Sequence, residues 1–203
     1  MSERKAGAAR VGGGREAVLS AALQNFYKYG YHGTSMRNIA TDADMTVASI
    51  YHHFESKQEI LQEIMVRILS DLMSQTRTAL MAADDSPRNQ LEALVFAWIV
   101  FHANRQTEAF VGSTEVRSLD PEGRRLVVAL RDEQERMFRE VIDRGAREGQ
   151  FETAFPKEAT RAVINMGSSV SSWYDSKGDL SPQQLAEMYV TMALGTVQAT
   201  DVE

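Results

Sequence analysis

Residues 57–82 carry an apolar stripe with the period of an α-helix, and this run limits what the chain can fold into. Ser56 precedes the run as a helix cap, and Pro87 follows its end. A helix of this length spans roughly 40 Å and is well suited to join two domains. The apolar side chains recur at intervals of three and four residues: Ile60, Leu61, Ile64, Met65, Ile68, Leu69, Leu72 and Met73.

Other segments show the same helical periodicity, and no segment shows a convincing strand pattern or an internal repeat. We therefore predict an all-α fold with about nine helices. Residues 1–14 mix Gly, Ala, Arg and Lys without periodicity, and we expect them to be a disordered tail. The remaining helices are predicted near 15–29, 35–43, 47–53, 87–103, 105–118, 122–148, 156–175 and 181–199.

Composition narrows the class of protein further. The 203 residues are 43% hydrophobic and 25% charged, which fits one large or two small globular domains. The absence of cysteine excludes disulfides and thiolate chemistry. The most apolar run, 93–101, is too short to span a bilayer, and residues 1–14 show no signal peptide. We expect a cytoplasmic protein that does not enter a membrane.

Two short helices joined by a tight turn precede the long helix, in the order of a helix-turn-helix that reads DNA. Gly30 ends the helix before them, and Thr34 or Ser35 caps the first. Asp44 occupies the turn, where a left-handed backbone is tolerated, and Thr46 caps the second. We predict a DNA-binding domain over 15–57 and a second domain over 58–203.

The distribution of charge agrees with this division. The chain has a net charge of −6, which is unfavourable for binding DNA as a whole. Residues 1–57, however, hold 7 Lys and Arg against 5 Asp and Glu, whereas residues 58–203 hold 15 against 23. The small basic excess lies with the predicted DNA-binding domain, where it favours contact with phosphates.

The second short helix would expose a face suited to base edges. Ile50 and Phe54 would pack inward, and small side chains on the other side would let the backbone approach the major groove. We predict base contacts from Thr46, Val47, Ala48, Ser49 and His52. Phosphate contacts are predicted from Thr34, Ser35, Met36, Tyr51, His53 and Lys57, and Arg37 is a candidate for either role.

The residues give no sign of a metal site, a cofactor or a catalytic site. His52 and His53 are adjacent, so they do not face one side of a helix as metal ligands should. The other two histidines, His32 and His102, are scattered, and no glycine-rich loop is placed to hold a phosphate. These patterns argue against an enzyme.

The segment 15–65 resembles the DNA-binding domain of the TetR family of bacterial transcriptional regulators. Asp44 departs from the usual Gly, and Val47 and Ala48 replace frequent Lys and Gly, which makes the base-reading face more apolar. The resemblance implies a ligand-responsive regulator, most simply a repressor that leaves a palindromic operator when an effector binds. It rests on Gly30-Tyr31, Thr34-Ser35, Ile39-Ala40, Tyr51-His52-His53-Phe54 and Ser56-Lys57.

The resemblance also implies a C-terminal domain that binds an effector and forms a homodimer. His102 is either a residue at the edge of the core or a polar contact inside a ligand pocket. The last two helices either pack within the chain alone or form a four-helix bundle with a second subunit. Candidate ligand residues are Met65, Leu69, Trp98, Phe101, His102, Phe138 and Trp173, and candidate dimer residues are Val163, Met166, Val170, Tyr174, Leu185, Met188 and Met192.

The segment 172–181 resembles one TetR branch in which several members respond to acyl-CoA thioesters. An acyl-CoA is therefore the first candidate effector. A multidrug-type sensor of aromatic ligands and an architectural DNA binder without a ligand are the alternatives.

Overall fold

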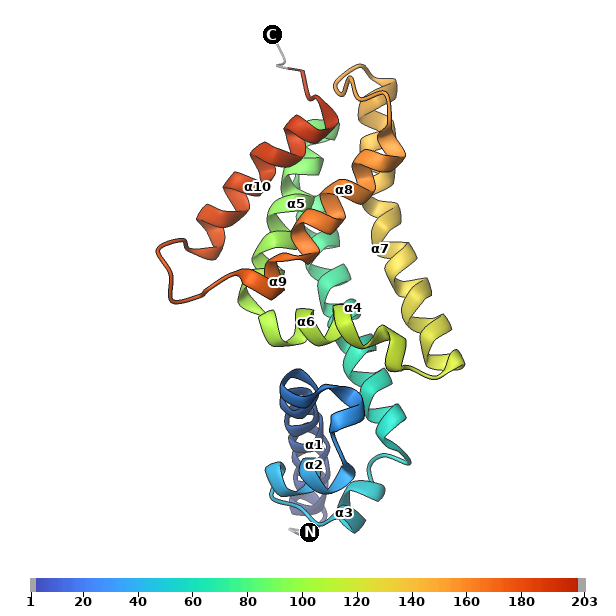
Figure 1. Ribbon diagram of the computed structural model, residues 1–203. Coiled ribbons are helices and arrows are strands. Elements are labelled where there is room, and N and C mark those ends of the chain that lie inside the picture. The colour runs from blue at the N-terminus through green and yellow to red at the C-terminus, as the bar shows by residue number, and fades with distance from the viewer. Residues whose placement is uncertain (1–2, 201–203) are drawn as a thin grey trace. The chain divides into compact units, whose positions relative to one another are not determined.

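The computed structural model describes the backbone of residues 3–200 and the side chains of residues 13–200. The regular secondary structure in that range is helical, apart from one isolated antiparallel bridge between Phe151 and Ala199 (Figure 1). The helices are α1 (Glu3–Gly33), α2 (Met36–Asp42), α3 (Val47–Tyr51), α4 (Lys57–Ala82), α5 (Pro87–Asn104), α6 (Gln106–Thr114), the 3-10 helix η1 (Glu115–Ser118), α7 (Pro121–Arg147), α8 (Pro156–Ser168), α9 (Val170–Trp173) and α10 (Pro182–Val197).

The predicted all-α class is confirmed, and the predicted elements match closely. Only Ser169 separates α8 from the four-residue α9, so the pair corresponds to the single helix predicted over 156–175. The segment predicted as one helix over 105–118 is α6 followed by η1. None of the described helices is long and apolar enough to cross a membrane.

The N-terminal segment differs from its prediction. Helix α1 begins at Glu3, so residues 3–14 are helical where the sequence analysis expects disorder, and residues 1–2 lie outside the described range. The segment 3–10 contains Ala, Arg, Lys and Glu, which favour helix. Adding turns to a helix that is already nucleated costs less than starting one, so residues 3–14 extend the helix despite four glycines.

The chain forms two compact units, and α4, α6 and α7 each contribute residues to both. The first unit contains the chain up to Ile68 together with Phe110–Val127, and the second contains Leu69–Ala109 and the chain from Val128. This division differs from the predicted boundary at residue 57. The reason is that the first turns of α4 bury Ile60, Leu61 and Ile64 in the first unit.

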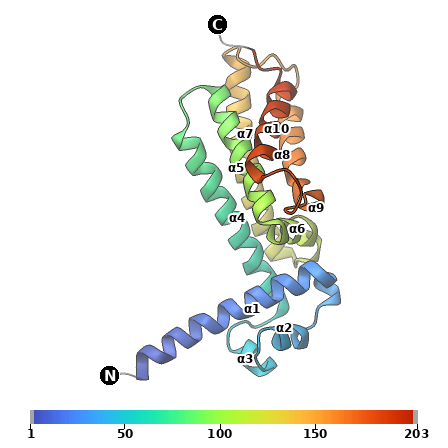
Figure 2. The same cartoon turned by 90° about the vertical axis from the view of Figure 1, so that its left-hand side faces the viewer.

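In the first unit, α1 packs on α2, and α2 contacts α3 (Figure 2). Gly30 has a φ of 70°, which ends the regular part of α1 as predicted and turns the chain toward α2. The core is formed by large side chains that are almost fully buried: Phe26, Ile39, Ile50, Phe54, Ile60 and Leu61.

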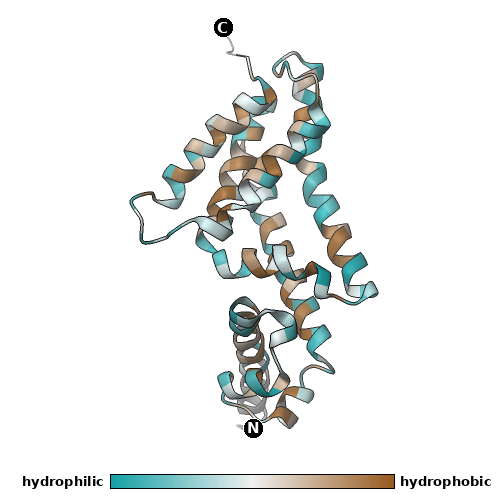
Figure 3. Cartoon of the chain, in the orientation of Figure 1, coloured by the Kyte–Doolittle hydropathy of each residue, from teal (hydrophilic) through white to brown (hydrophobic). Residues whose placement is uncertain are grey.

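In the second unit, α5 is the central helix, and α8, α9 and α10 pack against it. Figure 3 shows hydrophobic residues along α5 and an alternation of hydrophobic and hydrophilic segments along α7. Leu94, Trp98 and Ile99 of α5 are buried.

This packing corrects part of the predicted dimer surface. Val163, Val170, Tyr174 and Leu185 are buried within the chain, because α8, α9 and α10 turn their most apolar faces onto α5. Met166 is half-buried, and Met188 and Met192 are exposed.

Candidate nucleic-acid interface

Side-chain caps fix both short helices of the helix-turn-helix. The Ser35 hydroxyl accepts a hydrogen bond from the Asn38 backbone at 3.1 Å, and the Asn38 side chain accepts one in return from the Ser35 backbone at 2.9 Å. The Thr46 hydroxyl accepts a bond from the Ser49 backbone at 3.1 Å. Between the helices, Asp44 has a φ of 53°, which is the left-handed conformation predicted for this turn.

Helix α3 presents two different faces. Ile50 and Phe54 are buried, as predicted, and hold the helix against the rest of the unit. Thr46, Ala48 and His52 are exposed, and Tyr51 is exposed to 53%. Val47, Ser49 and His53 are half-buried beside them. The structure therefore brings the predicted base-reading residues together on one accessible face.

The start of α2 supplies part of the predicted phosphate-binding set. Ser35 and Arg37 are exposed, and Met36 is half-buried. Thr34 is buried, and its hydroxyl donates to the Gly30 carbonyl at 2.9 Å. The predicted phosphate contact from the Thr34 side chain is therefore not supported, since that hydroxyl already closes the turn after α1.

Lys57 connects the first turn of α4 to the turn after α1. Its ammonium donates to the carbonyl of Tyr31 at 2.7 Å and to the carbonyl of Thr34, and it lies 4.2 Å from the centre of the Tyr31 ring. Burial lowers the pKa of this ammonium. Two of its three donors are thus occupied within the chain, leaving one for the predicted phosphate contact. The carbonyls lie more than twenty residues upstream, so sequence spacing alone did not indicate this brace.

An ion network that the sequence pattern did not indicate joins α1 to α4. Glu63 pairs with Arg15 and with Arg67, the latter at 2.6 Å, and Arg67 also reaches Glu16 at 2.7 Å. Burial acts to raise the pKa of Glu63, but the two guanidinium groups outweigh it and lower that pKa. Arg15 also lies 4.5 Å from the centre of the Phe54 ring. The first turns of α4 are therefore held to α1 and to the turn after it through several contacts.

Four of the predicted ligand residues meet in the core of the second unit. The Trp98 ring centre lies 4.6 Å from that of His102 and 5.5 Å from that of Phe138, and Phe101 lies 5.7 Å from His102. We call Trp98, Phe101, His102 and Phe138 the aromatic core. Leu69 is buried in the same unit, whereas Met65 belongs to the first unit. Trp173 is 52% exposed and stacks on Tyr189, so it does not join the aromatic core.

The polar atoms of the aromatic core are constrained. His102 Nδ1 lies 2.7 Å from the Trp98 carbonyl, which can only accept, so Nδ1 carries the proton. Burial lowers the pKa of His102 to about 4, and the imidazole is neutral at pH 7. The indole Nε1 of Trp98 is buried and has no hydrogen-bond partner among the residues that the structure describes. A bound molecule that offers an acceptor to this N–H would recover the cost of its burial.

The titration of His102 predicts a dependence of stability on pH. The folded pKa lies below the unfolded value, so the unfolded state binds the extra proton and stability falls as pH decreases below about 6.5. Through His102, the free energy of unfolding of the wild type should fall by about 2 kcal/mol between pH 7 and pH 5. His102→Asn should not show this part of the decrease. Urea unfolding of both proteins at each pH measures the difference. Equal losses in the two proteins would contradict the assignment.

Comparisons with known proteins agree with this geometry. The sequence profile described as "Bacterial regulatory proteins, tetR family" matches residues 18–64, which contain α2 and α3. The profile described as "Tetracyclin repressor-like, C-terminal domain" matches residues 84–197, more than half of the chain.

Relatives extend the similarity over nearly the full length. The HTH-type transcriptional repressor KstR2 of Mycobacterium tuberculosis is 27% identical over 94% of this chain and 96% of its own. A tetR-family regulatory protein from Rhodococcus RHA1 has a TM-score of 0.85 at 29% identity, covering 93% of this chain and 98% of that chain. The structure of AibR in complex with isovaleryl coenzyme A and operator DNA has a TM-score of 0.81 at 24% identity, covering 88% and 97%.

Proposed function

The chain belongs to the TetR family of bacterial regulators, and from this premise we propose that it is a dimeric repressor that an apolar acyl-CoA thioester releases from a palindromic operator. Its relatives are transcriptional regulators rather than enzymes. The observation that carries the proposal is the exposed face of α3, formed by Thr46, Ala48 and His52 above the buried Ile50 and Phe54. Relatives that match almost the whole chain are named repressors, which supports this direction of control.

We assign different roles to neighbouring residues of α3. His52 and Ala48 read base edges, with Thr46, Val47 and Ser49, whereas Tyr51 and His53 contact phosphates together with Ser35, Met36 and Lys57. Arg37 is exposed on α2 and contacts either a phosphate or a base. In this assignment the phosphate contacts set the affinity for any duplex, and the base contacts set the preference for the operator sequence.

This division of roles is tested with two variants of adjacent exposed residues. His52→Ala should reduce the preference for the operator over random DNA by about 1–3 kcal/mol, because a base contact is lost. Tyr51→Phe should weaken binding to both duplexes by a similar factor, because a phosphate carries no sequence information. Titrations of both duplexes by fluorescence anisotropy measure the two factors. A uniform loss for His52→Ala would refute its base-reading role.

For the dimer we propose a smaller surface than the sequence suggested. Met188 and Met192 are one helical turn apart on α10 and are 50% and 44% exposed, and Met166 and Trp173 add partly exposed apolar surface on α8 and α9. We take these exposed apolar side chains as the surface that meets a second copy, because large apolar patches on a protein surface often mark interfaces. Pairing α8 and α10 with the same helices of a second copy would form a four-helix bundle. The two DNA-binding domains of the dimer would then bind the two halves of a palindrome.

A charge on this surface should separate the subunits. We expect Met192→Glu to produce monomers with unchanged helical content. Their operator binding should be at least about tenfold weaker, since each DNA-binding domain then binds alone. Met81→Glu is the matched control, because Met81 is 80% exposed at the end of α4 and does not belong to the proposed dimer surface. Sedimentation equilibrium distinguishes the states, and a dimeric Met192→Glu protein would contradict the surface.

The proposed effector site is the aromatic core. An acyl chain would pack against Trp98, Phe101 and Phe138, and its thioester carbonyl would accept from the unpartnered Trp98 Nε1. AibR, whose fold this chain shares, binds isovaleryl coenzyme A and operator DNA, which supports an acyl-CoA as the ligand class. A cationic aromatic ligand is the alternative, in which case the protein is a multidrug-type sensor. A series of acyl-CoAs, free fatty acids and aromatic cations separates the two when each compound is scored by release of the protein from operator DNA as well as by thermal shift.

The response would be a shift between two populations. Helix α4 contributes residues to both units, and its first turns are held to α1 and the turn after it by Lys57 and by the ion pair between Glu63 and Arg15. A ligand that favours one position of α4 in the second unit would change the spacing of the two DNA-binding domains in the dimer. The ligand can shift the equilibrium between the conformation that binds DNA and the one that does not only by the difference in its affinity for these two conformations.

A further inference from the structure

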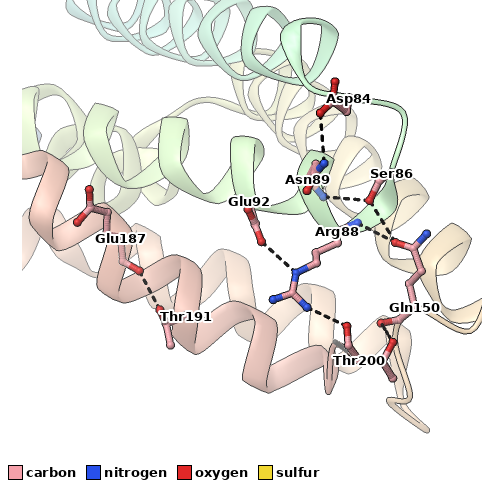
Figure 4. Close-up of polar contacts among 9 residues, drawn as sticks. All are labelled: Asp84, Ser86, Arg88, Asn89, Glu92, Gln150, Glu187, Thr191 and Thr200. Atoms are coloured by element: carbon pink, nitrogen blue, oxygen red, sulfur yellow. Dashed lines mark hydrogen bonds and ion pairs between the residues drawn. The ribbon is translucent and has the colours of Figure 1, made fainter. Parts of the chain in front are cut away.

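A groove of about 610 Å³ lies over α5 in the second unit, between the end of α4 and α10. Figure 4 shows α5 running between these two helices. Alanines form most of its apolar lining, and because their side chains end at Cβ, the space between the helices stays open. The lining is completed by Phe96, which is 37% exposed, and by Val190; the alanines are Ala79, Ala82, Ala83, Ala93 and Ala97.

The charged residues that line the groove are all acidic. Asp84 follows α4, Glu92 lies on α5, and Glu187 lies on α10 (Figure 4). None of the described residues that line the groove is a lysine or an arginine. Glu92 pairs with Arg88 at 3.3 Å, and Asp84 accepts a bond from Asn89 at 3.5 Å, so two of the carboxylates have partners. Glu187 forms no ion pair with the residues that the structure describes.

We propose that this groove binds an amphiphilic organic cation, a molecule with one ammonium group and an apolar body. The ammonium pairs with Glu187 and Glu92, the apolar body covers the alanines, and the partly exposed Phe96 ring offers its face to the cation. The volume suits a ligand of drug-like size. An anionic acyl-CoA is repelled by the same carboxylates, so the groove is a second site, distinct from the aromatic core.

The test is isothermal titration calorimetry of the full chain with decyltrimethylammonium below its micelle concentration. Decanoate is the matched ligand control, because it has a similar apolar chain and the opposite charge. We expect the ammonium to bind and the decanoate to bind at least about tenfold more weakly, since only the former complements the carboxylates.

Three variants locate the binding. Glu187→Gln should weaken ammonium binding about fivefold, as the loss of a partly exposed ion pair does, whereas Glu122→Gln, an exposed acid outside the groove, should leave it unchanged. Ala97→Leu should fill the groove and reduce binding at least about tenfold. Helical content reports on folding, and because Glu187 is exposed, its variant remains informative if Ala97→Leu fails to fold.

Each contrary result would overturn the proposal. Undetectable ammonium binding, equal affinity for decanoate, or wild-type affinity in both Glu187→Gln and a folded Ala97→Leu would show that the groove does not bind an organic cation. The proposal does not depend on the repressor function, since the calorimetry contains no DNA and the aromatic core is unchanged in every variant.

Discussion

Phe54→Ala is expected to lower the free energy of unfolding by about 3–5 kcal/mol and to abolish operator binding. The Phe54 ring is 1% exposed, lies one turn after Ile50, and carries the Arg15 guanidinium on its face. Its removal leaves a cavity beneath α3 and takes away the ring contact of Arg15, a member of the ion network that holds α4 to α1. Urea unfolding followed by tryptophan fluorescence and circular dichroism gives the loss of stability.

Tyr51→Ala is the control for this effect. Tyr51 lies three residues earlier on the exposed side of α3, so its truncation should change the free energy of unfolding by no more than about 0.5 kcal/mol. DNA affinity should still fall, because a phosphate contact is lost. If Phe54→Ala and Tyr51→Ala had equal effects on stability, the assigned inner and outer faces of α3 would be wrong.

Gly167→Ala is expected to lower the free energy of unfolding by about 2–3 kcal/mol, although alanine favours helix over glycine. A Cβ atom at residue 167 would lie 2.2 Å from Cδ1 and 2.5 Å from Nε1 of Trp98. The indole would have to move, and the aromatic core with it. Denaturant unfolding gives the stability, and the emission of Trp98 should shift in the folded protein.

A double-mutant cycle isolates the contact. Trp98→Leu removes the indole edge that the new methyl group would meet, so Gly167→Ala should cost much less in that background. Equal costs in both backgrounds would show that the close approach of Gly167 to Trp98 does not limit the stability of the core.

The helices and the two faces of α3 could be predicted from sequence because they depend on local periodicity. The caps at Ser35 and Thr46, the stop at Gly30 and the left-handed Asp44 all follow from single residue types with strong backbone preferences. The length of α1 was missed, because the balance between four glycines and good helix-forming residues is not visible in a periodic pattern.

Contacts between distant segments could not be predicted in the same way. Periodicity identifies an apolar face, but it does not say whether that face meets the same chain or a second copy, and so Val163, Val170 and Leu185 were assigned to a dimer surface. The brace from Lys57 to the carbonyls of Tyr31 and Thr34 depends on the turn geometry of the folded unit. The pair Glu63 and Arg67, four residues apart on α4, was the available signal for the ion network.

The most direct test is to select bound duplexes from a random DNA pool with the full chain and to sequence them, with and without an acyl-CoA series. We expect an enriched inverted repeat, because the two DNA-binding domains of a dimer bind the two halves of one palindrome. We also expect that this enrichment is lost in the presence of at least one acyl-CoA. Retained fragments without a shared motif would contradict DNA reading by α3, and an enrichment that no acyl-CoA reduces would contradict the proposed effector.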